Sequence, residues 1–290
     1  MVKVTIDASL CKGHYACIEI CPHKLLVKQE ADSIPQFTSG DLCISCGHCV
    51  AICPEGAIIH DDFPKDSVKP INRELTPSSE QIAHMLKVRR SVREFIDRPV
   101  ERKLIEAIID AARFAPSGCN SQSTEFVVIQ NRVVLKKISE LTALYLTDMV
   151  KALHNPVMRR IACFIYKDGA EQMVSSLPVL KRFAELHDAG YEMILFNAPV
   201  LIVFHGVRDA PGSQVNATLA LQNASLMAQA LGLGHVYVSF VVAAAFKEQR
   251  IREILSIPKR NRVHGALALG YPKYQYENWV ERKQPRVRWI

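Results

Sequence analysis

Cysteine placement constrains this chain more than any other feature of its sequence. Seven of the nine cysteines lie between Cys11 and Cys53, and the other two are Cys119 and Cys163. No apolar segment follows the first residues as it would in a secretory signal, so we expect a cytoplasmic protein, where disulfide scaffolds are rare. Clustered cysteines in such a chain favour metal binding.

The clustered cysteines form two runs that share one spacing. The second run reads CISCGHCVAICP from Cys43, a complete C-x2-C-x2-C-x3-C-P pattern. The first reads CKGHYACIEICP from Cys11, with His14 in the second ligand position. This spacing is typical of cubane iron–sulfur ligation, in which three close thiolates bind one cluster and the fourth binds the other. Paired zinc sites are the alternative, but the repeated triple spacing before Cys-Pro favours iron.

Residues 1–60 resemble the bacterial two-cluster ferredoxins, and the resemblance implies crossed ligation. One cluster would take four thiolates, those of Cys21, Cys43, Cys46 and Cys49. The other would take Cys11, Cys17 and Cys53, with His14 at its fourth corner. His14 either binds the corner iron, which would raise the cluster potential, or points away and leaves a [3Fe-4S] cluster in place of [4Fe-4S]. His48, between two ligands, is expected to face solvent or donate to a cluster sulfur.

Charge divides the chain at the same place. Residues 1–60 carry four Lys or Arg against six Asp or Glu, whereas residues 61–290 carry 32 against 23. The segment that joins them contains prolines and charges without an apolar period, which is typical of a linker. We therefore predict a two-cluster domain at 1–62, a linker at 63–79 and a second domain at 80–290.

Apolar periodicity in the second domain predicts helices and strands in one chain. An amphipathic helix is expected over 101–115, ended by Pro116. Another is expected over 216–231, with Asn216 as its N-cap and Gly232 as its terminating glycine. Strands are expected at the four segments EFVVIQ, PVLIVFH, VYVSFVV and GALALGY. PVLIVFH is apolar almost throughout, so it should be buried on both faces.

A basic run, KVRRSVREF from Lys87, offers three guanidiniums and a hydroxyl. Such a group suits a phosphate because Arg binds it bidentately, although a solvated face is the alternative. RRSVREF is followed in order by APSGCNSQ from Ala115, ALGLG from Ala230, GYP from Gly270 and a basic tail. In order and spacing, these motifs of residues 80–290 resemble the FMN-dependent nitroreductase family.

The resemblance implies an α+β protein in which a small ferredoxin-like iron–sulfur domain precedes a nitroreductase-like three-layer α-β-α domain. It implies a homodimer with FMN at the interface. Phosphate and ribityl contacts would come from the basic run, at Arg89, Ser91 and Arg93. The partner subunit would place on the flavin a loop containing Pro116, Ser117, Gly118 and Asn120. The flavin ring would face the backbone near Val238 and Ser239, and a C-terminal pair would return to the phosphate, Arg282 and Lys283.

Three other residues are expected to be structural. Cys119 has no base nearby in sequence, so we expect a packed small residue and not a reactive thiol. Cys163 is expected in the core. His235 is expected to cap or pack at the start of its strand, because in such proteins the flavin does the chemistry. Residues 122–124 depart from the Gln-Pro-Trp common in the family, so the acceptor's shape is not implied.

These inferences predict an FMN-dependent reductase. Electrons would pass from an external ferredoxin-like donor through two cubane clusters to FMN, and on to a small organic acceptor such as a nitroaromatic, a quinone or an activated double bond. A non-enzymatic electron carrier or redox sensor with FMN as relay is the alternative. A second alternative is a reductive dehalogenase or flavin-modifying offshoot, whose lid would lie in 145–195. No nucleic-acid motif accompanies the charge, and the uncharged stretch 210–246 contains many polar residues, so neither nucleic acid nor membrane is an expected partner.

Overall fold

A computed structural model describes residues 2–166 and 175–290. The chain divides into two compact units: unit 1 comprises residues up to 78 with 119–121, and unit 2 comprises 79–118 with 122–290. Among the described residues, no helix combines the length and the apolar character needed to cross a bilayer. The side chain of Cys163 and residues 167–174 of the expected lid region lie outside the described part of the chain.

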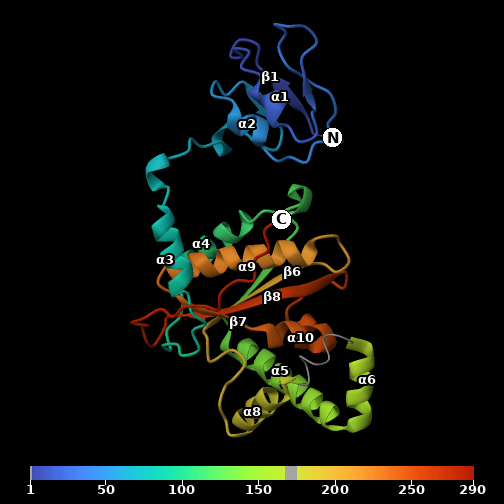
Figure 1. Ribbon diagram of the computed structural model, residues 1–290, viewed down its shortest axis with the longest axis vertical. Coiled ribbons are helices and arrows are strands. Elements are labelled where there is room, and N and C mark those ends of the chain that lie inside the picture. The colour runs from blue at the N-terminus through green and yellow to red at the C-terminus, as the bar shows by residue number, and fades with distance from the viewer. Residues whose placement is uncertain (1, 167–174) are drawn as a thin grey trace. The chain divides into compact units, whose positions relative to one another are not determined.

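Unit 1 consists of short elements joined by loops (Figure 1). In chain order these are β1 (Val4–Ile6), α1 (Ala16–Ile20), β2 (Leu26–Val27), β3 (Gln36–Phe37), α2 (His48–Ile52), β4 (Ile58–His60), η1 (Lys65–Ser67) and η2 (Arg73–Leu75). β1 pairs with β4 and β2 with β3, both antiparallel. The two 3-10 turns η1 and η2 lie in the segment expected to be a linker.

Unit 2 is a sheet covered by helices on both faces (Figure 1). Its helices are α3 (Ser79–Val88), α4 (Arg102–Arg113), α5 (Arg132–His154), α6 (Pro156–Tyr166), α8 (Leu177–Asp188), α9 (Ser213–Ala230), α10 (Ser239–Lys247) and α11 (Gln249–Ile254). Its strands are β5 (Glu125–Ile129), β6 (Val200–Val207), β7 (Gly234–Tyr237) and β8 (Asn261–Gly270). The strand order is β5-β6-β8-β7, and every pair is antiparallel. This three-layer arrangement confirms the predicted α+β class.

Strand β6 shows why helices cover both faces of the sheet. Val200, Ile202 and Phe204 pack in the cluster with α4 and α9, whereas Leu201 and Val203 pack in the cluster with α5 and α10. All five side chains are fully buried. Because successive strand residues point to opposite faces, a strand apolar at every position needs a layer on each side, as its sequence predicts.

Two sequence expectations about this unit are wrong. VYVSFVV does not form one strand: β7 ends at Tyr237, and α10 begins at Ser239. The helix forms because Val241, Ala244 and Ala245 recur at helical spacing and are buried on one face. Asn216 is not an N-cap but lies in the first turn of α9, which begins after Gly212. Its side chain instead bonds a neighbouring loop.

Candidate functional site

Two cavities in unit 1 are lined by the cysteines of the two runs. The first is bordered by Cys11, His14, Cys17 and Cys53. The second is bordered by Cys21, Cys43, Cys46 and Cys49. Each cavity thus takes one cysteine from the other run, which is the arrangement that crossed ligation requires. The donor sets fit cubane clusters, because the ligands of a cubane surround a shared core.

The two runs follow one repeated backbone conformation. The second and fourth residues after each leading cysteine have left-handed φ values: 71° at Gly13, 55° at Tyr15, 49° at Ser45 and 71° at Gly47. These bends curl each loop before its short helix begins. The φ of Gly47 favours glycine, and a Cβ there would also lie 3.2 Å from the ring of Phe63.

Backbone donors and burial set the chemistry of the thiols. The sulfur of Cys21 accepts the N–H of Leu25, and the sulfur of Cys53 accepts that of Ala57, both at 3.4 Å. Burial raises the pKa of Cys49 to about 11. This thiol therefore keeps its proton until a metal displaces it, and the backbone donors then stabilise negative charge on their sulfurs.

Two histidines of unit 1 occupy different environments. His48, the first residue of α2, is exposed. This agrees with the first of its two predicted roles, in which the side chain faces solvent. His60, the last residue of β4, is buried, and its Nε2 lies 3.7 Å from the sulfur of Cys43. His60 is not among the site residues predicted from the sequence. The spacing of residues in the sequence does not indicate the contact between His60 and Cys43, because the pairing of β4 with β1 brings His60 to the second cavity.

In unit 2 the basic run lies along the edge strand β7. Ser91 forms a bridge with His235, whose carbonyl accepts the N–H of Val92 at 3.0 Å. Arg89 and Ser91 are half-buried, and Arg93 is exposed. Within the described part of the chain, no carboxylate forms an ion pair with Arg89 or Arg93. Their guanidiniums therefore remain available to an anion.

The side chain of His235 lies beneath this run. Its side chain is 3% exposed, and neither ring nitrogen has a hydrogen-bond partner among the described residues. Burial, followed by the charge of Arg89, lowers its pKa to about 4. The ring packs at its strand as predicted, but no cap is formed. It is neutral at neutral pH, so it adds no second positive charge beside Arg89.

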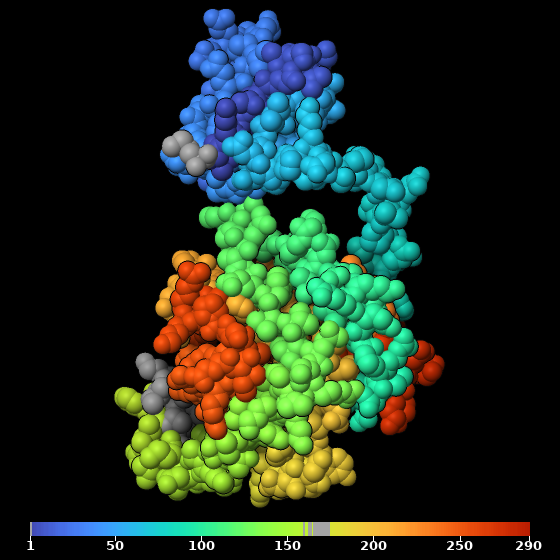
Figure 2. Space-filling view, turned by 180° about the vertical axis from the view of Figure 1, so that it is seen from behind, coloured from blue at the N-terminus to red at the C-terminus, as the bar shows by residue number. Residues whose placement is uncertain are grey.

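The C-terminal tail returns to the basic run. Figure 2 shows the tail, drawn red, on the surface of unit 2 beside the teal segment that follows α3. Lys87 lies 4.9 Å from the ring centroid of Trp279, and the guanidinium of Arg90 lies 5.8 Å from that of Tyr276. Shortly beyond these contacts come two exposed cations, Arg282 and Lys283.

The remaining predicted flavin contacts, Val238 and Ser239, lie between the end of β7 and the start of α10. Val238 is buried, and its N–H donates to the carbonyl of Ala266 at 3.0 Å. Ser239, the first residue of α10, is exposed. The first N–H groups of a helix have no acceptor within the helix. This helix start can therefore donate to an electron-rich group.

The loop after α4 is held by its own chain. The N–H of Gly118 donates to the side chain of Asn216 at 3.1 Å, and Ser117 accepts the N–H of Gln122 at 3.0 Å. Cys119 is exposed, so the expectation of a packed residue is wrong. A left-handed turn, with φ of 50° at Cys119 and 51° at Asn120, displays the side chain instead of packing it. Pro116 is also exposed.

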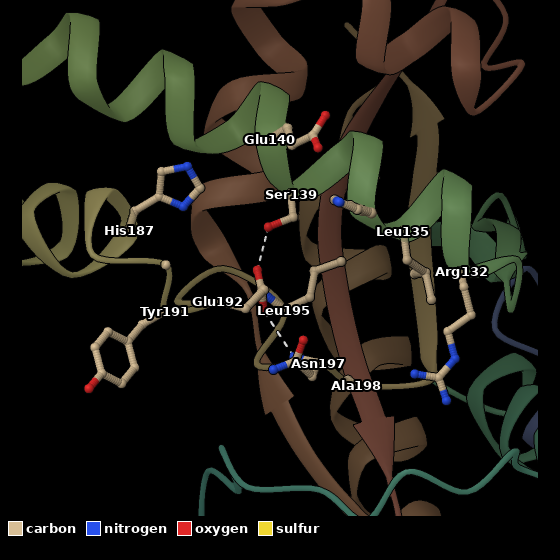
Figure 3. Close-up of a pocket in the computed structure, with 12 residues that line it drawn as sticks. Arg132, Leu135, Ser139, Glu140, His187, Tyr191, Glu192, Leu195, Asn197 and Ala198 are labelled. Carbon is tan, nitrogen blue, oxygen red and sulfur yellow. Dashed lines mark hydrogen bonds between the residues drawn. The ribbon is translucent and has the colours of Figure 1, made fainter.

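A further cavity, of about 590 Å³, lies between α5 and the segment after α8 (Figure 3). Glu192 organises its wall: its carboxylate accepts the Ser139 hydroxyl and the backbone N–H groups of residues 194, 195 and 197. These bonds hold Phe196 and Asn197 in left-handed conformations. The ring centroid of Phe196 then lies 5.7 Å from the guanidinium of Arg93. None of the expected flavin contacts lines this cavity.

The fold and these sites define a class: an oxidoreductase in which a two-cluster iron–sulfur unit precedes a three-layer unit. That unit carries a group of arginines that form no ion pair with a carboxylate of the described residues. Comparison with known families is in accord. The chain belongs to the nitroreductase family, whose model matches residues 86–271. Residues 10–58 match the 4Fe-4S dicluster domain. Both predicted resemblances are confirmed, and the second favours iron–sulfur clusters over zinc.

Individual relatives agree with both assignments. A protein of Archaeoglobus fulgidus named as an NADH dehydrogenase/NAD(P)H nitroreductase is 30% identical over 194 residues, which cover 67% of this chain and 87% of that protein. A Ferredoxin 7Fe of Hydrogenibacillus schlegelii is 37% identical over 54 residues, 19% of this chain and 65% of its own length. A nitroreductase of Desulfitobacterium hafniense, solved with bound FMN, has a TM-score of 0.54 at 19% identity, covering 71% of this chain and 97% of its own. This last likeness shows the shared fold.

Proposed function

We propose that this protein is an iron–sulfur flavoprotein reductase that uses electrons from a ferredoxin-like donor to reduce a small organic acceptor. The observation that carries the proposal is the presence, on one chain, of two crossed cysteine cavities and a group of arginines without a carboxylate partner in the described part of the chain. FMN, when bound, supplies the conversion between one-electron and two-electron chemistry. Nitroaromatics, quinones and activated double bonds are the acceptor classes that suit it.

The residues of unit 2 would hold FMN by complementary charge and hydrogen bonding. A phosphomonoester carries nearly two negative charges and needs several cations. Arg89 and Arg93 offer guanidiniums without carboxylate partners, and Ser91 offers a hydroxyl between them. The tail would add Arg282 and Lys283. The backbone near Val238 and Ser239 would face the polar edge of the ring system, with the N–H of Ser239 as the donor, because the N–H of Val238 already bonds Ala266.

A second copy of the chain would complete the flavin site. In the loop formed by Pro116, Ser117, Gly118 and Asn120, Pro116 and Gly118 are exposed, and Gly118 is anchored through Asn216. Asn120 is half-buried, and its amide donates to the carbonyls of Ile44 and Ser45 at 3.2 and 2.7 Å. Residues 116–118 can reach a neighbouring subunit without losing this anchor, and Asn120 would exchange its two carbonyl acceptors for the flavin. We propose that the protein is a homodimer in which each loop covers the partner's FMN.

The cavities of unit 1 would hold the clusters with the crossed ligand sets. His14 lines the first cavity with three cysteines, which supports a place in that ligand set. Its ligation is decided by iron content. About eight irons per chain are expected if His14 binds the corner iron, and about seven if the corner is empty.

The test uses the full chain purified anaerobically. We expect iron, sulfide and one FMN per chain, and reduction of acceptors by dithionite- or ferredoxin-reduced protein. Arg89→Ala should weaken FMN binding by about tenfold or more, because it removes a charge-assisted bond to the phosphate. Arg102→Ala is the matched control, since Arg102 is exposed and paired with Glu106 on α4.

Three outcomes would contradict the proposal. Protein without flavin would remove the reductase function. Equal FMN affinity in Arg89→Ala and Arg102→Ala would remove the phosphate site from the basic run. Reduced protein that no acceptor reoxidises would favour an electron carrier or redox sensor instead.

A further inference from the structure

His60 brings a side-chain nitrogen to a cysteine sulfur of the second cavity. It ends β4, pairs with Val4 of β1 and is 3% exposed. Its Nε2 lies 3.7 Å from the sulfur of Cys43, within the range for a bond to sulfur. The ring also borders the cavity shared by the four cysteines of this site.

The hydrogen bonds of the ring define where its proton lies. Nδ1 of His60 is 3.1 Å from the backbone nitrogen of Asp62, whose N–H can only donate. Nδ1 must therefore accept, and in the neutral ring the proton is on Nε2, the nitrogen that faces Cys43. Phe63 fixes the ring from one side, with centroids 4.8 Å apart. The Nε2–H donor is thus preoriented toward the sulfur.

We propose that His60 is a positioning residue that raises the reduction potential of the cluster held by Cys21, Cys43, Cys46 and Cys49. The inference rests on the iron–sulfur part of the proposed function. Reduction adds one electron and hence one negative charge, part of which is carried by the thiolate sulfurs. A buried N–H donor to one of these sulfurs stabilises the more negative state, and hydrogen bonds to sulfur are known to set cluster potentials.

The repeat within unit 1 provides an internal comparison. His60 follows Cys53 by seven residues, and the equivalent residue after Cys21 is Lys28. Lys28 is exposed, and its ammonium lies 4.5 Å from the ring centroid of Tyr15 instead of meeting a cysteine. The backbone donors to sulfur are the same in both halves, at 3.4 Å. The imidazole donor therefore distinguishes the second site from the first.

The experiment measures the potential of each cluster in the full-length protein by EPR-monitored redox titration. His60→Leu should lower the reduction equilibrium constant of one cluster by about tenfold, which is 59 mV for a one-electron couple. The other cluster should not change. His60→Gln should recover part of the shift, because its amide can donate to the same sulfur. Lys28→Leu, at the equivalent position, should change neither potential.

The iron content of the His60→Leu variant shows whether both clusters are present, so it is measured with the potentials. A fully loaded His60→Leu variant with both potentials unchanged would overturn the proposal, and so would an equal shift in both clusters. If His60→Leu loses iron, pulsed EPR of the ¹⁵N-histidine-labelled protein provides the test. The reduced second cluster should couple to a histidine nitrogen in the wild type and lose this coupling in His60→Gln; no coupling in the wild type would overturn the proposal. Absent flavin with intact clusters would count against the reductase function alone.

Discussion

At the start of β7, the buried ring of His235 has no hydrogen-bond partner among the described residues and lies near the charge of Arg89. Both features favour its neutral form. A protonated ring there would compete with the arginines for a bound phosphate. We infer that burial keeps the cationic charge of this site on the guanidiniums, which are at the surface where an anion can reach them.

This environment predicts a pH-dependent stability at the residue scale. The pKa of His235 is about 4 in the folded protein against 6.5 unfolded. As pH falls below 6.5, the unfolded chain binds a proton that the folded chain does not, so folding stability is lost. Between pH 7 and pH 5 the loss is about 2 kcal/mol.

Urea unfolding of flavin-free protein checks this prediction. The wild type should lose about 2 kcal/mol more than His235→Leu over that pH interval. His84→Leu, which replaces an exposed histidine of α3, should behave like the wild type. Parallel pH dependences for the wild type and His235→Leu would contradict the prediction.

At the scale of elements, the approach of the basic run to β7 depends on one missing side chain. A Cβ at Gly234 would lie 2.8 Å from Cγ1 of Val92. Because the contact is with a β-branched side chain close to its backbone, little relief is available by rotation. The glycine therefore allows the segment carrying Ser91 to pair beside His235.

We expect Gly234→Ala to destabilise unit 2 by about 1–3 kcal/mol, the usual effect of overpacking, and to weaken FMN binding. Val92→Ala in the same chain should restore part of both, because it removes the clashing methyl groups. Unfolding free energies and FMN titrations of the two single variants and the double variant measure this coupling. Strictly additive effects would show that Val92 is not the source of the strain.

At the scale of the whole molecule, the two units differ in how they are stabilised. Among the described residues of unit 1, few apolar side chains are buried: Val4, Leu25, Leu26, Ala57 and Ile58. Unit 2 has two extensive buried clusters, one on each face of its sheet. A small unit with so little core generally needs metal or cross-links to fold.

Removal of the clusters should therefore unfold unit 1 and leave unit 2 folded. Anaerobic treatment with a chelator and reductant, followed by hydrogen exchange and mass spectrometry, tests this on the intact chain. Peptides from β1 and β4 should lose protection, whereas those from β6 and β8 should keep it. Retained protection of β4 without iron, or joint loss in both units, would contradict this prediction.

Much of this architecture could be predicted from local pattern. Gly232 does follow α9 with φ of 74°, and PVLIVFH is buried as expected. Prediction failed where an element's end depends on distant packing. VYVSFVV has a strand's composition, but burial of Val241 beneath the sheet turns its second half into helix. Asn216 resembles a cap, yet its partner is Gly118, 98 residues away in sequence.

Local sequence pattern establishes the two kinds of unit, the candidate cysteine ligands and the family motifs, because these depend on spacings of a few residues. Which side chains from distant segments meet depends on the tertiary fold. The contact of His60 with Cys43 requires β4 to pair with β1, and the placement of Arg89 beside a buried His235 requires the basic run to pair with β7. Strand pairing joins residues far apart in the chain, so no local spacing records these contacts.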